Sequence, residues 1–289
     1  MQKMDLKNTK LLLYKGKQTK KVEQARKTIK NWAGENEISL RDVSNQKDIQ
    51  RTLTEEGKET ILLSLGGDGT FLRASDMIAP YLVPILGINL GKLGFLSGLN
   101  FSELENGLNS MLENGFSINN LTRLRCRVEP ENSLESLSFT ALNEVVISRG
   151  EFTGLAEVEL FLDSKKVATY PGDGLIVSTP TGSTAYSLSC GGPLITRNTS
   201  AFSITPLNVH KLGLRPIICS DSTEIRIKTN SNVSIEVDGK GVGSLEKGKY
   251  VDIDKSETST LMVLPEDQSN FFETVRNKLN WDKDRGTGC

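Results

Sequence analysis

The chain has 289 residues, of which 37% are hydrophobic and 25% are charged, with 35 Lys and Arg against 36 Asp and Glu. This composition is typical of a globular protein with a substantial core, and its near-zero net charge does not favour nucleic acid or an anionic membrane as a partner. No segment has the length and apolarity of a transmembrane helix, and the N-terminus lacks the layout of a signal peptide. We therefore expect a cytoplasmic protein.

The sequence gives little indication of a metal site built from protein side chains. The cysteines are widely spaced, at Cys126, Cys190, Cys219 and Cys289, and His210 is the single histidine. These residues lack the spacing of a zinc site, so we expect no metal ligands among the site residues, reduced thiols and a structural role for His210.

The first part of the chain alternates patterns of strands and helices. Strands are predicted over 10–14, 61–65 and 83–88, and helices over 20–33, 70–78 and 101–112. Continuous apolar strands separated by helices indicate a parallel sheet that is covered on both faces. Ligands of such sheets bind beyond the carboxyl ends of the strands.

A glycine-rich loop, Gly66-Gly67-Asp68-Gly69-Thr70, lies between the strand at 61–65 and the following helix. Its glycines let backbone N–H groups approach a ligand, and a helix N-terminus adds partial positive charge, so phosphate is the expected ligand. A carboxylate repels phosphate, which indicates that Asp68 faces a metal ion or accepts a proton from a hydroxyl group. The loop therefore predicts phosphoryl transfer, with helix capping by Asp68 as the alternative.

A basic cluster precedes and begins the first predicted helix. It consists of Lys15, Lys17, Lys20 and Lys21. We interpret it as a solvated face rather than a binding patch, because runs of charge on a helix usually face water.

From about residue 121 the pattern changes to short segments rich in β-forming residues. Strands are predicted over 124–129, 142–148, 158–162, 175–178, 223–228, 233–237 and 250–253. Hairpin turns are predicted at Asp163-Ser164-Lys165 and Asp238-Gly239. This part reads as an antiparallel β-sandwich domain. An amphipathic helix over 270–279 follows, and we expect it to pack on the first domain.

A second glycine-rich region begins with Gly172-Asp173-Gly174 and continues to Pro193 through small and hydroxylated residues. Its segment 181–184 can cap a short helix over 183–189, which would create a second anion site. The hydroxyl groups and the Tyr186 ring suit a sugar or a base. Alternatively, the hydroxyl groups satisfy their own backbone.

Two adjacent polar residues, Asn143 and Glu144, interrupt the apolar strand predicted over 142–148. Neighbouring side chains in a strand point to opposite faces, so one of the two is expected to point inward. Because burial without partners is costly, a ligand would supply those partners. An exposed strand end is the simpler alternative.

Over nearly its whole length the chain resembles the NAD kinase family. The loop 66–70 alone is shared with lipid kinases of the diacylglycerol and sphingosine type and with phosphofructokinases, whereas Asn143-Glu144 combined with 173–193 is far more specific. The resemblance implies an α/β + β fold, with a Rossmann-like α/β domain at 1–118 joined by 263–289 and a β-sandwich domain at 119–262.

The same resemblance implies an enzyme that transfers a phosphoryl group from ATP to the 2′-hydroxyl of the adenosine ribose of NAD, forming NADP. It implies Mg²⁺ or another divalent metal with the ATP, and a homo-oligomer, either a dimer or a tetramer, in which a neighbouring subunit helps to complete the NAD site.

The resemblance also implies roles for individual residues. Asp68 would accept the proton, Gly69 would lie beside the dinucleotide, Arg73 would face phosphate or ribose, and Phe95 would lie near the adenine. Asn143 and Glu144 would hold adenine and ribose hydroxyl groups, Asp173 would lie at the nicotinamide end, and Asp238 would lie close to the acceptor. The residues that would line adenine, ribose and phosphate are Thr181, Thr184, Ala185, Tyr186, Ser187, Leu188 and Ser189. The family pattern differs at Pro171 and Gly154, where some members carry a basic residue or histidine, and this affects the nicotinamide-side contacts.

Two other functions compete with this interpretation. A kinase of the same loop type could act on a lipid or a sugar phosphate, although those families lack the second glycine-rich region. A sensor could bind NAD or NADP without turnover, against which the intact Asp68 argues.

Overall fold

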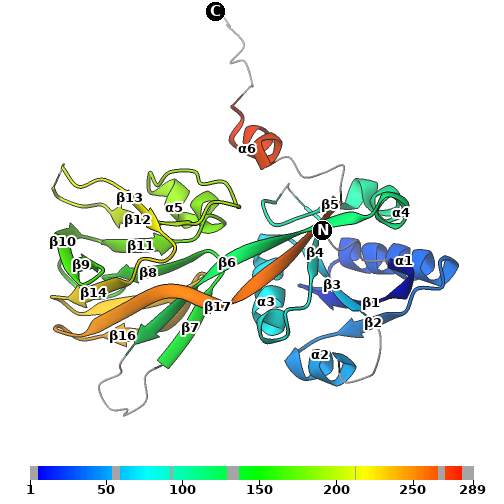
Figure 1. Ribbon diagram of the computed structural model, residues 1–289, viewed down its shortest axis with the longest axis horizontal. Helices are drawn as coiled ribbons and strands as arrows, with labels where there is room; N and C mark the ends of the chain where they lie inside the picture. Colours follow the sequence, from blue (N-terminus) through cyan, green and yellow to red (C-terminus); the bar gives the residue numbers. More distant parts are fainter. Residues whose placement is uncertain are drawn as a thin grey trace, which may run out of the picture. The chain divides into compact units, whose positions relative to one another are not determined.

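The computed structural model describes residues 6–53, 59–91, 94–128, 137–211, 213–265 and 271–281. Two compact units make up the chain (Figure 1), namely Met1–Asn120 with Thr260–Cys289, and Leu121–Ser259. The boundaries expected from the sequence, at 118/119 and 262/263, lie within three residues of these.

The first unit contains a parallel sheet. Its strands are β1 (Thr9–Lys15), β2 (Leu40–Val43), β3 (Glu59–Gly66), β4 (Ile85–Asn89) and β5 (Leu99–Asn100), in the order β2-β1-β3-β4-β5. Its helices are α1 (Lys20–Glu35), α2 (Gln46–Leu53), α3 (Asp68–Ile78), α4 (Leu104–Asn114) and α6 (Phe271–Leu279), with short 3₁₀ turns at Leu6–Asn8, Ala79–Tyr81 and Phe101–Glu103. The α/β architecture expected from the sequence is confirmed.

Helices cover both faces of this sheet, which explains the unbroken apolar run of β3. Ile61, Leu63 and Leu65 pack with α1 and α4 in one core cluster. Phe71 of α3 contacts the opposite face, where a Cβ at Gly87 of β4 would meet its ring at 3.0 Å. A strand buried on both sides has no polar face, so its sequence does not alternate.

Besides the two-residue strand β5, two short elements of this unit escaped the sequence prediction. Strand β2 is half-buried and lies at the sheet edge, where β1 is its one partner among the described strands. Helix α2 has only eight residues, with Ile49 and Thr52 buried. Both are too short and too polar to give a clear period.

The second unit is built from antiparallel strands. One sheet has the order β13-β12-β11-β8-β15-β16, and the other contains β10, β9, β14 and β17, with β6 pairing β7. The strands of the first sheet are β8 (Glu144–Ser148), β11 (Gly174–Ser178), β12 (Ala201–Leu207), β13 (Ile217–Ser220), β15 (Val233–Val237) and β16 (Lys240–Leu245). The remaining strands are β6 (Phe116–Val128), β7 (Leu137–Ala141), β9 (Ala156–Leu162), β10 (Lys165–Gly172), β14 (Ile225–Thr229) and β17 (Tyr250–Pro265). The predicted sandwich is confirmed.

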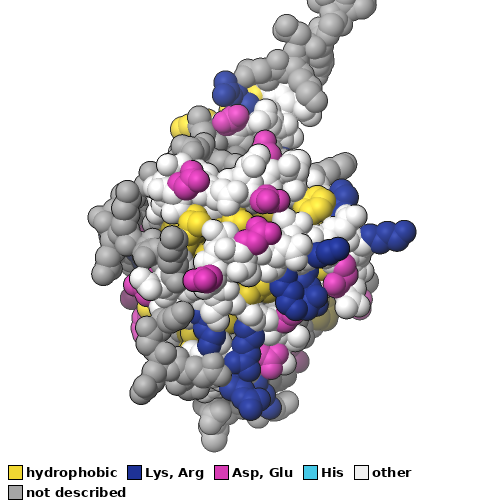
Figure 2. All heavy atoms as spheres, turned by 90° about the vertical axis from the view of Figure 1, so that its right-hand side faces the viewer, with side chains coloured by type: hydrophobic (Ala, Val, Ile, Leu, Met, Phe, Trp, Pro, Cys, Tyr) yellow, Lys and Arg dark blue, Asp and Glu magenta, His cyan; other side chains and the backbone are white. Residues whose placement is uncertain are grey.

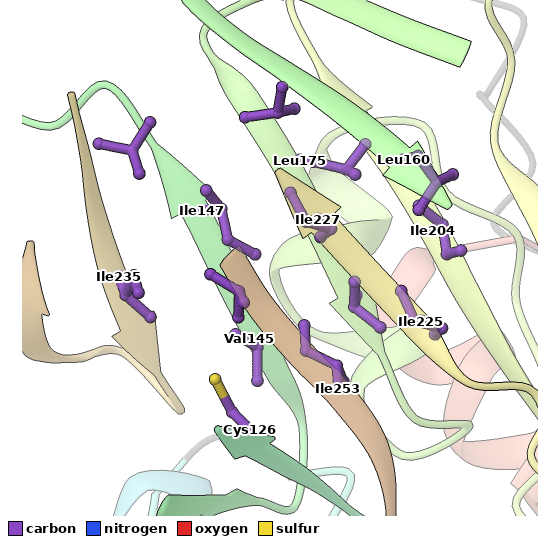
Figure 3. Close-up of a cluster of buried hydrophobic side chains, with 14 of the residues drawn as sticks. Cys126, Val145, Ile147, Leu160, Leu175, Ile204, Ile225, Ile227, Ile235 and Ile253 are labelled. Carbon is purple, nitrogen blue, oxygen red and sulfur yellow. The ribbon is translucent and has the colours of Figure 1, made fainter. Parts of the chain in front are cut away.

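The inner faces of these strands form one hydrophobic core (Figure 3). Along β8, Val145 and Ile147 point into this core, whereas Val146 belongs to a separate small cluster with Ile176 and Leu207. Side chains alternate along a strand, so Glu144 shares the outer face of β8 with Val146. Within the second glycine-rich region, Gly174–Ser178 is strand β11 itself, and the segment that follows contacts the outer face through Ser187 and Cys190.

Several predicted elements change at their ends. Strand β8 begins at Glu144 rather than at 142, and β17 has 16 residues instead of the expected four. Strands β7, β10, β12, β13 and β16 were not predicted. The two hairpin turns are confirmed by left-handed backbone at Asp163 (φ 47°) and Asp238 (φ 47°).

Helix α6 confirms the amphipathic helix predicted at 270–279 and belongs to the first unit. No helix among the described residues is long and apolar enough to cross a membrane. Figure 2 shows both acidic and basic side chains on one face of the molecule, with small hydrophobic areas between them.

Candidate active-site residues

In the first unit, the carboxylate of Asp68 joins two glycine-rich turns. Asp68 is the first residue of α3, and its side chain reaches the turn after β4. Oδ2 accepts the backbone N–H of Phe95 at 3.0 Å, and Oδ1 accepts that of Leu96 at 3.1 Å. The carboxylate is thereby fixed at a position where about a third of it remains exposed. Oδ1 keeps a further lone pair with which to accept a proton or a hydrogen bond.

The close approach of the two turns depends on Gly94. A Cβ at this position would lie 2.2 Å from Oδ1 of Asp68, so any larger residue would displace the carboxylate. The hydrogen bonds of the Asp68 carboxylate also test the alternative that Asp68 only caps α3. Its hydrogen bonds go to the amides of Phe95 and Leu96 and not to those of its own helix, so the capping alternative is wrong.

A cation from α6 also reaches Asp68. The Nζ atom of Lys278 lies 3.4 Å from Oδ2 of Asp68 and 4.1 Å from the centroid of the Phe95 ring. Phe95 is buried, with 7% of its surface exposed. The predicted residues Asp68 and Phe95 thus lie together with a lysine that no sequence motif had indicated.

Beside this group the first unit has a pocket of about 640 Å³. The glycine-rich loop forms one wall, through Gly66, Gly67 and Gly69. A Cβ added at Gly67 or Gly69 would meet nothing within 4 Å, so these two positions face open space, whereas Gly66 packs against the Thr70 side chain. The pocket therefore exposes bare backbone at the N-terminus of α3, an arrangement suited to an anion.

The opposite wall is basic. It includes Lys17 just before α1, Lys20 and Lys21 at the start of α1, and Arg73 of α3. None of the described lining residues is Asp or Glu, and no carboxylate among the described residues pairs with these three lysines. They are exposed, as a solvated face requires, and they also line a pocket. Lys15 differs, because it pairs with Glu23 at 3.8 Å.

In the second unit, Asn143 and Glu144 lie at the beginning of β8 and are both buried, at 8% and 6% exposure. Because β8 begins at Glu144, Asn143 lies just before the strand, and the expectation that both residues lie within it is wrong by one residue. The alternative of an exposed strand end is also wrong, because both residues are buried. Asp238, in the β15–β16 turn, holds this position. Its carboxylate accepts the backbone N–H groups of Leu142, Asn143 and Glu144 at 2.8, 2.8 and 3.1 Å.

The carboxyl group of Glu144 is in an unfavourable place for a charge. Its Oε2 atom is buried without a hydrogen-bond partner in the described structure. Burial, and next the negative charge of Asp238, raise the pKa of Glu144 to about 8, although a backbone hydrogen bond from Tyr186 opposes the shift. A buried polar atom without a partner is a position that a ligand hydroxyl group could satisfy.

The hydroxylated segment does not form the capped helix expected over 183–189. A 3₁₀ turn at Gly182–Thr184 ends at Ala185, where φ is −104° and ψ is −130°, and α5 then spans only Tyr186–Ser189. Neither element has a side-chain cap. The predicted second anion site is therefore not formed by a helix of useful length.

Most hydroxyl groups of this segment bond to nearby protein groups. Ser183 donates to the Pro180 carbonyl at 2.6 Å, and Thr184 donates to the Thr181 carbonyl at 2.9 Å. Ser187 bonds to Thr205 of β12 at 2.9 Å. The alternative that these hydroxyl groups satisfy their own backbone is confirmed for Ser183 and Thr184, whereas Ser187 bonds to a side chain of β12 and so ties the segment to the sheet.

A second pocket, of about 420 Å³, lies at the end of the same sheet. It brings together three predicted residues, Asp173, Tyr186 and Ser189. Asp173 is held by Arg149, whose Nε lies 3.0 Å from Oδ1, and by Asn208, whose Nδ2 donates to Oδ2 at 2.8 Å. The carboxylate is thus oriented from two strand ends.

The predicted residues therefore fall into separate groups. Gly69 and Arg73 line the first unit's pocket, while Asp68 bonds to the Phe95 amide beside it. In the second unit, Asn143, Glu144 and Asp238 form one cluster, and Thr181, Thr184, Ala185, Ser187 and Leu188 belong to the segment that packs near it. A Cβ at Gly182 would lie 2.1 Å from the Asn143 carbonyl oxygen, which shows how closely that segment approaches the cluster.

Sequence reasoning missed Lys278, Arg149 and Asn208, and assigned the lysines of α1 to solvent. Arg149 and Asn208 each follow a strand directly, at the ends of β8 and β12, which is a signal that could have selected them. Lys278 carries no such signal. Another cavity, lined by Arg226, Asp252 and Asp254 among others, contains no predicted residue, and Arg226 pairs there with Asp252 at 2.6 Å.

Comparison with known proteins gives consistent results along the chain. A family model described as the ATP-NAD kinase N-terminal domain matches residues 3–116, and one described as the ATP-NAD kinase C-terminal domain matches residues 142–264. The NAD kinase of Flavobacterium psychrophilum is 37% identical over 248 residues, covering 84% of this chain and 81% of its own. The NAD kinase of Moorella thermoacetica is 40% identical over 222 residues, covering 75% and 70%.

Two solved structures share the fold. The yeast NADH kinase complexed with NADH has a TM-score of 0.81 at 24% identity, covering 96% of this chain and 89% of its own. An NAD kinase from Archaeoglobus fulgidus in complex with ATP has a TM-score of 0.74 at 24% identity, covering 93% and 98%.

Proposed function

The chain belongs to the NAD kinase family and transfers a phosphoryl group from ATP to NAD, and we propose that Asp68 accepts the proton of the ribose 2′-hydroxyl in this reaction. The new bond joins the γ-phosphorus of ATP to the 2′-oxygen, the bond to ADP breaks, and the hydroxyl proton passes to the carboxylate. Membership of this family excludes the lipid or sugar-phosphate kinase. It also argues against a sensor without turnover.

One observation carries the proposal. The Asp68 carboxylate is fixed by the amides of Phe95 and Leu96 and remains partly exposed beside a pocket with bare loop amides. Phosphoryl transfer requires little covalent chemistry from the protein, since positioning and charge stabilisation dominate. A carboxylate held in one orientation next to an anion pocket meets both requirements.

We assign the donor phosphates of ATP to the pocket of the first unit. Loop amides at Gly67 and Gly69 and the cations of Lys17, Lys20, Lys21 and Arg73 can neutralise the chain of phosphates. The A. fulgidus relative was solved with ATP, which supports ATP as the ligand of this fold.

We assign NAD to the other predicted residues. Glu144 and Asn143 would bond to its hydroxyl groups and adenine, Asp173 would lie at its nicotinamide end, and Tyr186 would line adenine, ribose and phosphate. The buried, unpartnered Oε2 of Glu144 supports a hydroxyl ligand there. The complex of the yeast relative with NADH supports a dinucleotide.

A divalent metal, Mg²⁺ in particular, fits this arrangement as a companion of ATP. No group of three or more His, Cys, Asp or Glu side chains in the described residues could form a cage for a metal. Mg²⁺ is usually bound by one or two carboxylates together with substrate phosphates, so Asp68 is the protein ligand that fits best. When bound, the ion would neutralise charge on the phosphates.

We also propose that the enzyme is a cytoplasmic homo-oligomer. Cys126, Cys190 and Cys219 are free thiols, the state expected in a reducing compartment. Exposed apolar side chains on the second unit, including Ile218, Leu155 and Val167, would be covered by a second copy of the chain.

The test is an assay of the purified protein with ATP, Mg²⁺ and NAD, with NADP measured by an NADP-specific dehydrogenase. The wild-type chain should form NADP. Asp68→Asn should bind NAD within a few-fold of the wild type, while its turnover falls by at least about 10²-fold, the lower range for a lost acid-base group.

Two results would contradict the proposal. Tight NAD binding by the wild type without NADP formation would favour the sensor. Near-normal turnover by Asp68→Asn would remove Asp68 from the chemistry and leave the family assignment intact.

A further inference from the structure

The contact between Lys278 and Asp68 has no role in the function described so far. Lys278 lies in the last turn of α6, where a cation is favourable for the helix dipole. Its ammonium group nevertheless extends to another part of the first unit, where it lies 3.4 Å from Oδ2 of Asp68 and over the Phe95 ring at 4.1 Å.

Stability alone is a weak explanation for this contact. The Lys278 and Asp68 side chains are 28% and 32% exposed, and ion pairs of that exposure contribute little to the free energy of unfolding. The ring of Phe95 restricts where the ammonium group can go, because a cation is attracted to the face of an aromatic ring. The lysine is therefore held by two contacts, one with Asp68 at the start of α3 and one with the Phe95 ring in the turn after β4.

The three donors around Asp68 have different properties. The amides of Phe95 and Leu96 fix one edge of the carboxylate and cannot move independently of their turn. Lys278 supplies the only full positive charge within ion-pair distance of Asp68 among the described residues. A carboxylate beside incoming phosphate is repelled by it, and a neighbouring ammonium group offsets that repulsion.

We propose that Lys278 is a positioning residue for phosphoryl transfer, which keeps the Asp68 carboxylate oriented and compensates its charge as the phosphoryl group approaches. This inference rests on the proposed role of Asp68. It predicts that Lys278 affects turnover more than the binding of either substrate, because it acts on the reacting carboxylate.

The experiment compares Lys278→Met and Lys278→Arg in the full chain, with Lys27→Met as the matched control. Lys27 is an exposed lysine of α1 outside the pocket, so its substitution removes the same charge from the same unit. Lys278→Met should lower kcat by about 10- to 100-fold with both KM values within about threefold of the wild type. Lys278→Arg should recover most of the loss, and Lys27→Met should match the wild type.

A double variant separates this inference from the function on which it rests. If Lys278 acts through Asp68, adding Lys278→Met to Asp68→Asn should lower kcat by less than about threefold further, because residues that act as a unit are not additive. The inference would be overturned if the loss of kcat in the double variant equalled the product of the losses in the two single variants. It would also be overturned if Lys278→Met had a normal kcat. If Asp68→Asn itself kept normal turnover, the proposed role of Asp68 would fail instead.

Thermal unfolding of each variant guards against a purely structural effect. Lys278→Met and Lys278→Arg should both unfold within a few degrees of the wild type, since an exposed ion pair contributes little. The proposal would be overturned if both variants had a lowered Tm and a matching loss of activity, and if arginine did not restore activity. Lys278 would then serve only the packing of α6.

Discussion

At the scale of single residues, Glu144 shows how surroundings change the chemistry of a side chain. It lies on the outer face of β8, is buried, and has Asp238 as a charged neighbour. Burial disfavours the charged form of a carboxyl group, which explains its pKa of about 8. At neutral pH the group is largely protonated, and a neutral carboxyl group can donate a hydrogen bond as well as accept one.

This shift makes the stability of the protein depend on pH. The unfolded chain loses the Glu144 proton near pH 4.3, whereas the native state keeps it to about pH 8. The native state therefore binds more protons in this window, so the stabilisation is complete below about pH 4 and is lost as pH rises through about 8. Glu144→Gln stays neutral throughout. Its Tm relative to the wild type should rise by several degrees between pH 5 and pH 9.

Differential scanning fluorimetry at matched ionic strength checks this expectation. Glu151→Gln is the control, because Glu151 is exposed and its substitution should give a Tm difference that does not vary with pH. A Glu144→Gln difference that is equally flat would show that the carboxyl group is ionised in the native state.

At the scale of elements, the beginning of α1 has an arrangement that costs stability. Thr19 caps the helix through a hydrogen bond from the Val22 amide at 3.2 Å, yet Lys20 and Lys21 follow directly. Cations at a helix N-terminus oppose the helix dipole. Since both lysines line the pocket beside the glycine-rich loop, phosphate binding is a better explanation for them than helix stability.

We therefore expect the double variant Lys20→Gln/Lys21→Gln to raise KM for ATP by about tenfold or more, in line with the loss of two charge contacts. KM for NAD should change by less than about twofold. Its Tm should equal or slightly exceed that of the wild type because the dipole conflict is removed. Steady-state kinetics at two ionic strengths measure these effects.

The matched control is Lys27→Gln/Lys30→Gln, which removes two lysines of the same helix that do not line the pocket. It should leave KM for ATP unchanged. Equal effects of the two pairs on KM would mean that the net charge of α1, and not its position in the pocket, governs ATP binding.

At the scale of the whole molecule, each unit has its own core, and strands β6 and β17 belong to both. We expect the chain to assemble, because the second unit exposes Ile218, Leu155, Val167 and Tyr250. Light scattering after size-exclusion chromatography should give two or four times the chain mass of 31.7 kDa. A mass of one chain at micromolar concentration would contradict the proposed homo-oligomer.

Much of the fold could be predicted because its signals are local. The run 61–65 indicated a strand buried on both faces, and Asp163-Ser164 and Asp238-Gly239 have the residues that tolerate the left-handed backbone of hairpin turns. The short strands of the sandwich were less predictable. β12 lacks a clear alternation because all seven of its residues are buried, and it was missed.

The candidate site was predictable in its residue types and less so in its contacts. The sequence selected Asp68, but the structure gave it partners at Phe95, Leu96 and Lys278, the last 210 positions away. It selected Asp238 by resemblance, and the structure showed a carboxylate that holds the backbone at Asn143, 95 positions away.

By itself, the sequence determined the glycine-rich loops, the change from α/β to β pattern and the family, because each depends on neighbouring residues. Only the tertiary structure decided that 183–189 is broken at Ala185, that Glu144 is buried against a charge, and that Lys278 reaches Asp68. Hydrogen bonds, burial and charge depend on distances in space. The pairing of strands and the packing of helices decide which distant side chains come together, and the spacing of residues along the chain does not show this.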